Sequence, residues 1–304
     1  MTIADLQACG VLELLDVELA RALAAMTHTT NPDIELAIAL TSRNVRLGHS
    51  CLPLDMTASD VPELPEQEPW ANALLDSALL DGGPLVLDEK HRLYLRRYWE
   101  LERDIATELA KRSTSKAIDE PWLAEALDRL FGSDAKSPQR QAARNALKHR
   151  VSILCGGPGT GKTTTVAAIV ALLVEGRLRQ VGPAPKVMLL APTGKAAVRL
   201  GEAVTRTKKA ITASDEVLVN IPDEATTVHR ALGMRRHGMR FSRGADFPID
   251  ANIIVLDEAS MIDLALMRQL LVAAPPDATI LIVGDPDQLT SVEAGSVLRD
   301  LVRA

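Results

Sequence analysis

Residues 151–164 read VSILCGGPGTGKTT, an apolar stretch followed by a glycine-rich loop and the start of a helical segment. The loop fits the pattern G-x-x-x-x-G-K-[ST], in which backbone N–H groups can surround phosphate oxygens. Lys162 can reach the β and γ phosphates of a nucleotide, and the Thr163 hydroxyl can ligate Mg²⁺. A glycine-rich turn that only caps a helix is the alternative. The residues expected to bind nucleotide here are Gly156, Gly157, Pro158, Gly159, Thr160, Gly161, Lys162, Thr163 and Thr164.

Short apolar stretches alternate with helical segments throughout the part of the chain that follows Val151. Strands are expected at VSILC, KVMLLA, NIIVLD and TILIVG, and helices at 162–175, 194–208 and 264–274. This alternation predicts right-handed βαβ units on a parallel sheet. In such a sheet ligands bind at the carboxyl ends of the strands. We therefore expect an α/β fold with a P-loop at that edge.

The residues before Val151 have a different pattern. Apolar residues at helical spacing predict helices at 12–26, from Asn31-Pro32 toward Leu40, and at 96–112. Residues 85–87 and 93–95 flank Asp88-Glu89-Lys90 as a β-hairpin would. We expect a mostly helical N-terminal domain with a small hairpin. The expected boundaries are 1–115 for this domain, 116–136 for a linker and 137–304 for the P-loop domain.

Composition excludes several classes of protein. Aromatic residues make up 3% of 304 residues, which argues against an all-β sandwich, and a net charge of -6 excludes an overall basic coat for nucleic acid. The three cysteines are odd in number and lack metal-ligand spacing. No apolar run approaches about 18 residues, and the N-terminus lacks the basic start of a signal peptide. These features predict a cytoplasmic protein that does not span a membrane.

Polar residues that could catalyse phosphoryl transfer follow two of the predicted strands. Asp257 and Glu258 close the strand NIIVLD, so Asp257 could hold Mg²⁺ while Glu258 deprotonates the attacking water. Gln288 follows the strand TILIVG in GDPDQL and could sense the γ phosphate. An acidic N-cap at Asp257 and a plain turn at Gln288 are the alternatives.

Other polar and basic residues suit the backbone of a nucleic-acid strand. Thr193, Gly194 and Lys195 begin a helix after the second strand, and His229 lies at the start of another. His229 could equally be a buried structural histidine. Two sets of basic residues could either be solvated faces or contact DNA phosphates. For the first set we favour a solvated face, and for the second set the two interpretations are equally supported. The two sets are Lys136, Arg140, Arg144 and Lys148, and the loop residues Arg235, Arg236, His237, Arg240 and Arg243.

Taken in chain order, these segments resemble the conserved motifs of superfamily 1 DNA helicases. Gln139, GGPGTGKTTT, APTGKAA, TVHRALG, VLDEASMID and GDPDQLTSVEAGSVL correspond to the Q-motif and to motifs I, Ia, Ib, II and III. The segments that correspond to motifs II and III are similar in sequence to the RecD family, the alpha subunits of exodeoxyribonuclease V. The segments GHSCLPL and PLVLDEKHRLYLRRYWELE in the N-terminal half resemble the same family.

The resemblance implies a DNA-dependent ATPase that moves 5′ to 3′ on single-stranded DNA. It implies ATP and Mg²⁺ as cofactors, single-stranded DNA and double-stranded DNA ends as substrates, and RecB and RecC as partners in double-strand-break repair. The residue matching Gln139 contacts adenine, and those matching Lys162, Thr163, Asp257, Glu258 and Gln288 carry hydrolysis. Thr193, Gly194, Lys195 and His229 fall in segments that touch DNA. Pro138 and the loose spacing around Gln139 depart from the Q-motif.

The resemblance also raises expectations about the end of the chain. Ala304 follows GDPDQL closely, whereas the family continues into a second RecA-like domain with an arginine finger. We therefore expect the second motor domain to be absent and hydrolysis by residues 1–304 alone to be very weak. The alternative function is an inactive fragment that only binds ATP or a protein partner. A metabolic P-loop kinase is less favoured, because nothing in the sequence supplies a lid for a small substrate.

Overall fold

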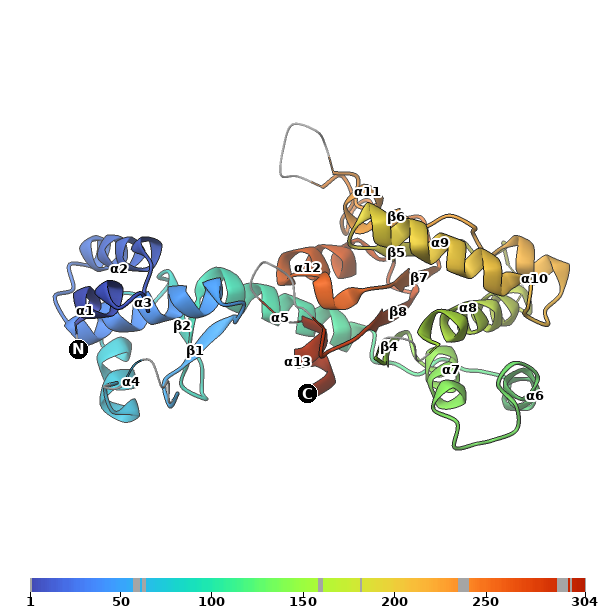
Figure 1. Cartoon of the computed structure of the whole chain (residues 1–304), viewed down its shortest axis with the longest axis horizontal. Coiled ribbons are helices and arrows are strands. Elements are labelled where there is room, and N and C mark those ends of the chain that lie inside the picture. The colour runs from blue at the N-terminus through green and yellow to red at the C-terminus, as the bar shows by residue number, and fades with distance from the viewer. Residues whose placement is uncertain are drawn as a thin grey trace. The chain divides into compact units, whose positions relative to one another are not determined.

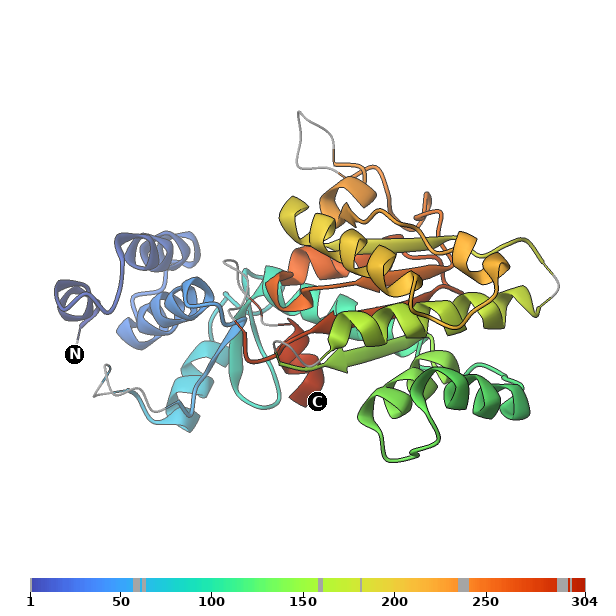
Figure 2. The same ribbon diagram turned by 45° about the vertical axis from the view of Figure 1, so that its right-hand side comes forward.

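The computed structural model describes residues 2–56, 61, 64–157, 161–180, 182–234, 241–288, 295 and 297–303. Pro158, Gly159 and Thr160 of the phosphate loop lie outside the described residues, as do residues 235–240 of the basic loop. The contacts divide the described residues into two compact units. The first contains the residues up to Asp104 together with Gly295, and the second contains the other residues from Ile105 onward. Both units are drawn in Figures 1 and 2.

The N-terminal unit combines four helices with a three-stranded antiparallel sheet. The helices are α1 (Ile3–Ala8), α2 (Leu14–Thr27), α3 (Pro32–Arg46) and α4 (Gln67–Leu75). The strands are β1 (Cys51–Pro53), β2 (Leu85–Leu87) and β3 (Arg92–Leu95), in the order β1-β3-β2. The predicted hairpin is therefore confirmed as β2 and β3. Strand β1 was not expected, because its partner β3 lies far along the chain and the stretch after Pro53 has the composition of a loop.

Local capping and one buried carboxylate fix the arrangement of α2 and α3. Asn31 accepts a hydrogen bond from Asp33 N at 2.9 Å, and Pro32 occupies the first turn, as a helix start requires. Asp16 of α2 is fully buried. Its carboxylate accepts from the Ser42 hydroxyl at 2.7 Å and from Arg46 Nη2 at 3.0 Å, both on α3. The unit therefore contains an ion pair that joins two helices, with a fully buried carboxylate and a partly exposed guanidinium.

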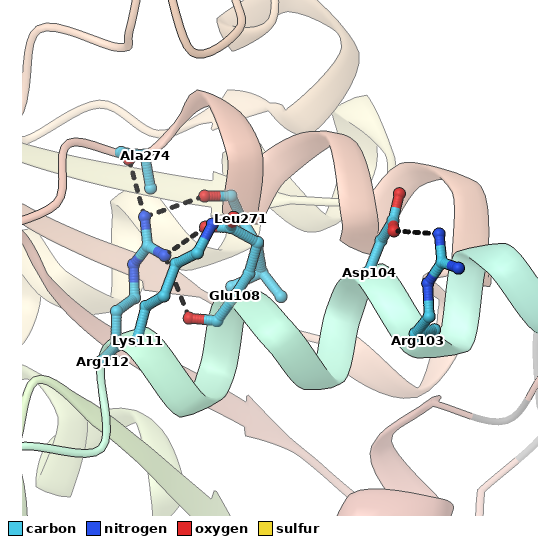
Figure 3. Close-up of polar contacts among 7 residues, drawn as sticks. All are labelled: Arg103, Asp104, Glu108, Lys111, Arg112, Leu271 and Ala274. Atoms are coloured by element: carbon cyan, nitrogen blue, oxygen red, sulfur yellow. Dashed lines mark hydrogen bonds and ion pairs between the residues drawn. The ribbon is translucent and has the colours of Figure 1, made fainter.

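The end of α5 (Arg96–Lys111) is tied to α12 (Leu264–Ala273) inside the second unit. Arg112 follows α5 and is buried. Its Nη2 atom donates to the carbonyls of Leu271 and Ala274, at 3.0 and 2.9 Å, and Nη1 donates to Glu108 at 2.6 Å (Figure 3). Because the last carbonyls of a helix lack partners within it, the guanidinium satisfies the C-terminal end of α12.

The second unit is built on a five-stranded parallel sheet in the order β4-β8-β7-β5-β6. The strands are β4 (Val151–Cys155), β5 (Val187–Ala191), β6 (Thr226–Thr227), β7 (Ile253–Leu256) and β8 (Thr279–Gly284). The four predicted strands are confirmed. Strand β6 was not predicted, because two threonines carry no apolar signal. The helices and turns are α6 (Glu120–Phe131), α7 (Pro138–Lys148), α8 (Lys162–Leu178), α9 (Gly194–Lys208), α10 (Asp215–Val219), α11 (Val228–Ala231), η1 (Ala259–Met261), α12 and α13 (Val297–Arg303).

Helices α8 and α9 cover one face of this sheet (Figures 1 and 2). Strand residues such as Leu189, Val255 and Val283 pack there with buried residues of α8 and α9. Strands β7 and β8 are buried along their length, which explains why they read as continuous apolar stretches. The predicted α/β fold with a parallel sheet, and the helical N-terminal region, are confirmed.

Helix α6 falls in the segment 116–136, which was expected to be a linker, and it packs within the second unit. Trp122 and Leu123 belong to the same core as α8, and the Trp122 indole donates to Glu175 at 3.0 Å. The first basic set of the sequence faces α6. Arg140 pairs with Asp128 at 2.7 Å, and Arg144 and Lys148 pair with Glu120 at 3.0 and 2.5 Å. Basic side chains of α7 thus form ion pairs with acidic side chains of α6.

None of the helices in the described ranges combines the length and the apolar character needed to span a bilayer.

Candidate nucleotide-binding site

The predicted nucleotide-binding and DNA-binding segments follow the carboxyl ends of neighbouring strands. Cys155 at the end of β4 is in register with Gly284 at the end of β8, and Ala191 of β5 with Thr227 of β6. Strand β7 lies between β8 and β5 and ends just before Asp257. Because all neighbouring strands are parallel, the residues that follow them share one edge of the sheet.

The described part of the phosphate loop is held by hydrogen bonds of its backbone groups with β8 and with the Lys162 side chain. Gly156 N donates to Gly284 O at 3.3 Å, which anchors the loop to β8. Gly161 is the N-cap of α8 with a φ of 79°, a left-handed conformation that favours glycine. Lys162 donates through Nζ to the carbonyls of Gly156 and Gly157, the latter at 2.9 Å. The ammonium therefore lies against the loop, where phosphates would bind.

The threonines that follow Lys162 lie in the first turn of α8. Thr163 is half-buried and Thr164 is exposed. Backbone N–H groups of a first helical turn have no partner within the helix and favour anions. The end of α8 is therefore suited to bind phosphate, and the Thr163 hydroxyl is available beside it to ligate a cation.

Asp257 and Glu258 occupy the turn between β7 and η1. Asp257 N donates to Leu190 O at 2.9 Å, and Asp257 Oδ1 accepts from Glu258 N at 2.9 Å. Burial raises the pKa of Asp257, the charge of Glu258 raises it further, and the Glu258 N–H and the charge of Lys162 oppose the shift. The carboxylate is thus desolvated and lies within electrostatic reach of Lys162. Both features suit a group that binds a cation next to phosphates.

Glu258 has a φ of 53°. A side chain with a Cβ adopts this left-handed conformation at a cost, and such strain is found mainly at functional sites. The turn orients Glu258 after the end of β7, where a general base for hydrolysis is expected.

Magnesium bound together with phosphates needs only one or two protein ligands. In the described ranges, no group of three or more His, Cys, Asp and Glu side chains comes together as a metal cage. The hard oxygen donors of Thr163 and Asp257 nevertheless fit Mg²⁺, because the half-buried Asp257 carboxylate accepts one hydrogen bond, from the N–H of Glu258, and keeps acceptor capacity for a cation. These two residues would hold the ion.

Asp285 is a residue of this site that sequence reasoning missed. It is 7% exposed and directly follows β8. Its Oδ2 accepts from Gln288 Nε2 and its Oδ1 from Asp287 N, both at 3.1 Å. Its charge also acts on the Cys155 thiol at the end of β4, whose pKa is raised by burial and then by Asp285, and lowered by Lys162. Asp285 therefore positions Gln288 beside the phosphate loop. In the sequence, the position of Asp285 directly after an apolar strand could have identified it as a site residue.

Gln139 lies in the first turn of α7 and is exposed. Its side-chain oxygen accepts from the Ser137 hydroxyl at 3.1 Å. Ser137 is also the N-cap of α7. The structure thus places Gln139 on the surface at the helix start, with a local hydrogen bond, and its contact with adenine stays a prediction.

The segments predicted to touch DNA begin α9 and α11, at the ends of β5 and β6. Thr193 caps α9 by accepting from Ala196 N at 3.2 Å, and Gly194 and Lys195 are exposed beside it. His229 is half-buried in α11, with its ring centroid 6.2 Å from that of Phe241. It is therefore accessible rather than fully buried. Of the basic loop residues, Arg243 is described, and its guanidinium stacks on Phe247 and donates to Pro248 O.

Comparison with known proteins identifies the family to which the chain belongs. A family model described as "AAA domain" matches residues 139–294, and a model described as "RecBCD enzyme subunit RecD, N-terminal domain" matches residues 8–94. The chain therefore belongs to the AAA domain family. The matched residues include the phosphate loop, Asp257, Glu258 and Asp285. The predicted resemblance to RecD is confirmed by the second match and by the curated relatives.

One of these relatives is the RecBCD enzyme subunit RecD of Mycobacterium tuberculosis, which is 41% identical over 299 residues, covering 96% of this chain and 51% of the relative. Another is the ATP-dependent RecD2 DNA helicase of Deinococcus radiodurans, 34% identical over 282 residues, covering 88% of this chain and 35% of the relative. The chain thus spans about half the length of the RecD relative and about a third of RecD2. Among solved structures, T4 UvsW matches with a TM-score of 0.36 and 13% identity, covering 66% of this chain and 42% of that one.

Proposed function

We propose that the chain belongs to an ATP-dependent DNA helicase that moves 5′ to 3′ along single-stranded DNA. It would act on DNA ends with RecB and RecC, as exodeoxyribonuclease V, in the cytoplasm and in double-strand-break repair. The observation that carries the proposal is the shared edge of the parallel sheet. The phosphate loop, Asp257 and Asp285 follow β4, β7 and β8, and Thr193 and His229 follow the adjoining strands β5 and β6.

The ATP-binding half of this edge has groups for each part of phosphoryl transfer. Lys162 leaves the loop carbonyls to neutralise the β and γ phosphates, and Thr163 and Asp257 would hold Mg²⁺. When bound, the ion would supply positive charge that stabilises the phosphates. Glu258 takes the proton from the attacking water, and Gln288, positioned by Asp285, donates its amide to the γ phosphate.

The other half of the edge offers contacts for a DNA backbone. The helix starts at Thr193 and Thr227 present N–H groups, and Lys195 and His229 add charged or polar side chains beside them. Contacts of this kind position a strand without reading its sequence. Because β7 lies directly between β8 and β5, a shift at Asp257 on ATP binding can reach the DNA contacts through one strand.

Support for the partners and for the domain roles comes from the similarity to RecD. The N-terminal match falls in residues 8–94, within the segment 1–115 that we propose as the partner-binding domain. Residues 137–304 are the proposed first motor domain, and α6 of the proposed linker packs against that domain.

A strand-displacement assay tests the direction and the need for partners. The complete protein, alone and mixed with RecB and RecC, would be given duplexes with either a 5′ or a 3′ single-stranded tail. We expect ATP-dependent unwinding of the 5′-tailed duplex. Unwinding of only the 3′-tailed duplex would contradict the direction, and failure to associate with RecB and RecC would contradict the proposed complex.

A further inference from the structure

A cavity of about 240 Å³ lies among α6, α7 and α8, at the edge of the parallel sheet opposite the phosphate loop. Ile253 and Thr279, the first residues of β7 and β8, contribute to its wall, together with Gly176 and Arg177 near the end of α8. Pockets for drug-sized ligands have volumes of about 300–1,000 Å³. This cavity is therefore suited to a smaller ligand.

Lys116 lines this cavity, and its ammonium donates to two uncharged acceptors, of which Thr279 also belongs to the cavity wall. Nζ donates to Ala146 O and to Thr279 Oγ1, both at 3.1 Å. An ammonium carries three N–H donors, so one donor is left for another partner. Burial and the nearby charges of Arg177 and Arg150 lower the pKa of Lys116 to about 7. The surroundings thus disfavour its positive charge.

The two arginines that act on Lys116 also lack a carboxylate partner within the described ranges. Arg177 Nη2 and Arg150 Nη1 donate to the same neutral group, the carbonyl of Asp277, at 3.0 and 2.7 Å. The Asp277 residue itself is exposed. The two arginines therefore share one neutral acceptor, and both lie within electrostatic reach of Lys116.

The carboxylates near this cavity are engaged elsewhere. Asp119 is the one carboxylate in its wall, and it accepts from Arg179, 3.3 Å away. Glu120 pairs with Arg144 and Lys148, and Glu175 pairs with Arg129. Further titratable groups at this edge are His149, beside Arg150, the exposed Asp277, and the Lys186–Asp250 pair.

Helix dipoles do not remove this excess of positive charge. Helices α7 and α8 both end here, and each C-terminus carries about half a negative elementary charge. Their sum is about one negative charge, against the three cations Lys116, Arg150 and Arg177. An anion in the cavity would supply the missing charge.

We propose that this cavity binds a single tetrahedral oxyanion of the phosphate type, held by Lys116 and Arg177. The same chemistry is offered by free inorganic phosphate and by the terminal phosphate of a DNA strand. Bound anion favours the protonated form of Lys116, so affinity is full below the free-state pKa of that group and falls as the pH rises above it.

Sulfate is a suitable probe, because it remains a dianion across the whole range in which Lys116 titrates. The ¹³Cε signal of Lys116, assigned with a Lys116→Arg variant, would be titrated with and without sulfate, with chloride added to equal ionic strength. We expect sulfate to raise the pKa of Lys116 and to bind roughly tenfold more weakly at pH 8.5 than at pH 6.5. The same titration curve in sulfate and in chloride would overturn the proposal.

Two variants separate binding from general screening. Lys186 also lies at the amino ends of the strands but pairs with Asp250 at 2.6 Å, so its signal serves as the control and should not respond to sulfate. Arg177→Gln should raise the pKa of Lys116 in the absence of sulfate, because it removes a repulsive charge, and should remove most of the sulfate effect. An undiminished sulfate effect in this variant, or an equal response at Lys186, would overturn the proposed site.

The source of the phosphate group is distinguished with oligonucleotides. The Lys162→Ala background weakens anion binding at the phosphate loop, because it removes the ammonium and leaves only the backbone N–H groups. In that background, inorganic phosphate and single strands with and without a 5′ phosphate would be compared through the Lys116 signal. A response to inorganic phosphate alone assigns a free ion, and a response to the phosphorylated strand alone assigns a DNA end. No response to either would contradict the proposal.

Discussion

Asp285 holds the side-chain amide of Gln288, with 3.1 Å between Oδ2 and Nε2. The carboxylate is almost fully buried, and its other oxygen accepts from Asp287 N. A flexible glutamine next to a phosphate site is thus oriented by a residue that lies directly after the strand β8. The relationship makes Asp285 a positioning residue for Gln288.

Asp285→Ala should therefore lower ATP turnover while ATP binding persists. Loss of a residue that orients a catalytic side chain typically costs about 10- to 100-fold. Gln288→Ala should have a similar effect, and the double variant should be little worse than either, because the two residues act as a unit. Asp287→Ala, in the same turn but exposed, is the matched control. Fully additive losses in the double variant would contradict the positioning role.

Glu258 offers a test that separates catalysis from folding. Glu258→Gln keeps the shape but cannot take a proton from water, so ATP binding should persist while turnover is lost. Glu258→Gly removes the left-handed strain of about 1–2 kcal/mol but adds a backbone entropy cost of about 0.5–1 kcal/mol. Its unfolding free energy should thus stay within about 1 kcal/mol of the parent. Filter binding, phosphate release and denaturant unfolding measure the three quantities. Equal loss of binding and turnover in Glu258→Gln would indicate a structural role.

Asp257→Asn should stabilise the fold while abolishing Mg²⁺-dependent hydrolysis. The pKa of Asp257 is raised by burial, so the ionised carboxylate costs stability at neutral pH. The difference from the parent should shrink as the pH falls through the folded-state pKa and vanish below the unfolded-state pKa. Thermal unfolding across this pH range is the measurement. A variant that is less stable at neutral pH would show that the carboxylate is a structural group.

Asp16→Ala should destabilise the N-terminal unit, because it leaves the buried Ser42 hydroxyl without its acceptor and removes one of the two carboxylates that pair with Arg46. Leaving a buried polar group unsatisfied typically costs about 1–3 kcal/mol. Glu18→Ala, which removes an exposed pair with Arg21 on the same helix, should cost less than about 1 kcal/mol. Denaturant unfolding of both variants tests this contrast, and equal effects would contradict it.

The sequence was sufficient to predict the parts of the structure that depend on local pattern. Continuous apolar stretches predicted β4, β5, β7 and β8, and the glycine pattern before Lys162 predicted the strand, loop and helix around it. Strands β1 and β6 were not predicted. They form because they pair with strands that are distant in the sequence, and their own composition does not indicate a strand.

The same limit applies to side chains whose roles depend on tertiary contacts. Lys116 donates to Thr279, 163 positions away, so its cationic surroundings have no signature in sequence. Asp285 was passed over because its hydrogen bond to Gln288 depends on the turn geometry after β8. The division of the chain within α5 could not be predicted either, since that helix is continuous in pattern.

The central claim is that this edge of the sheet hydrolyses ATP in response to DNA. The direct measurement is steady-state phosphate release by the complete protein in Mg²⁺ and ATP, with and without single-stranded oligonucleotide. It would be made for the parent, for Lys162→Ala and for Lys186→Ala, a control lysine paired with Asp250. We predict strong stimulation by DNA in the parent and in Lys186→Ala, and no turnover in Lys162→Ala with its fold intact by circular dichroism. Turnover that is indifferent to DNA, or that survives in Lys162→Ala, would contradict the account.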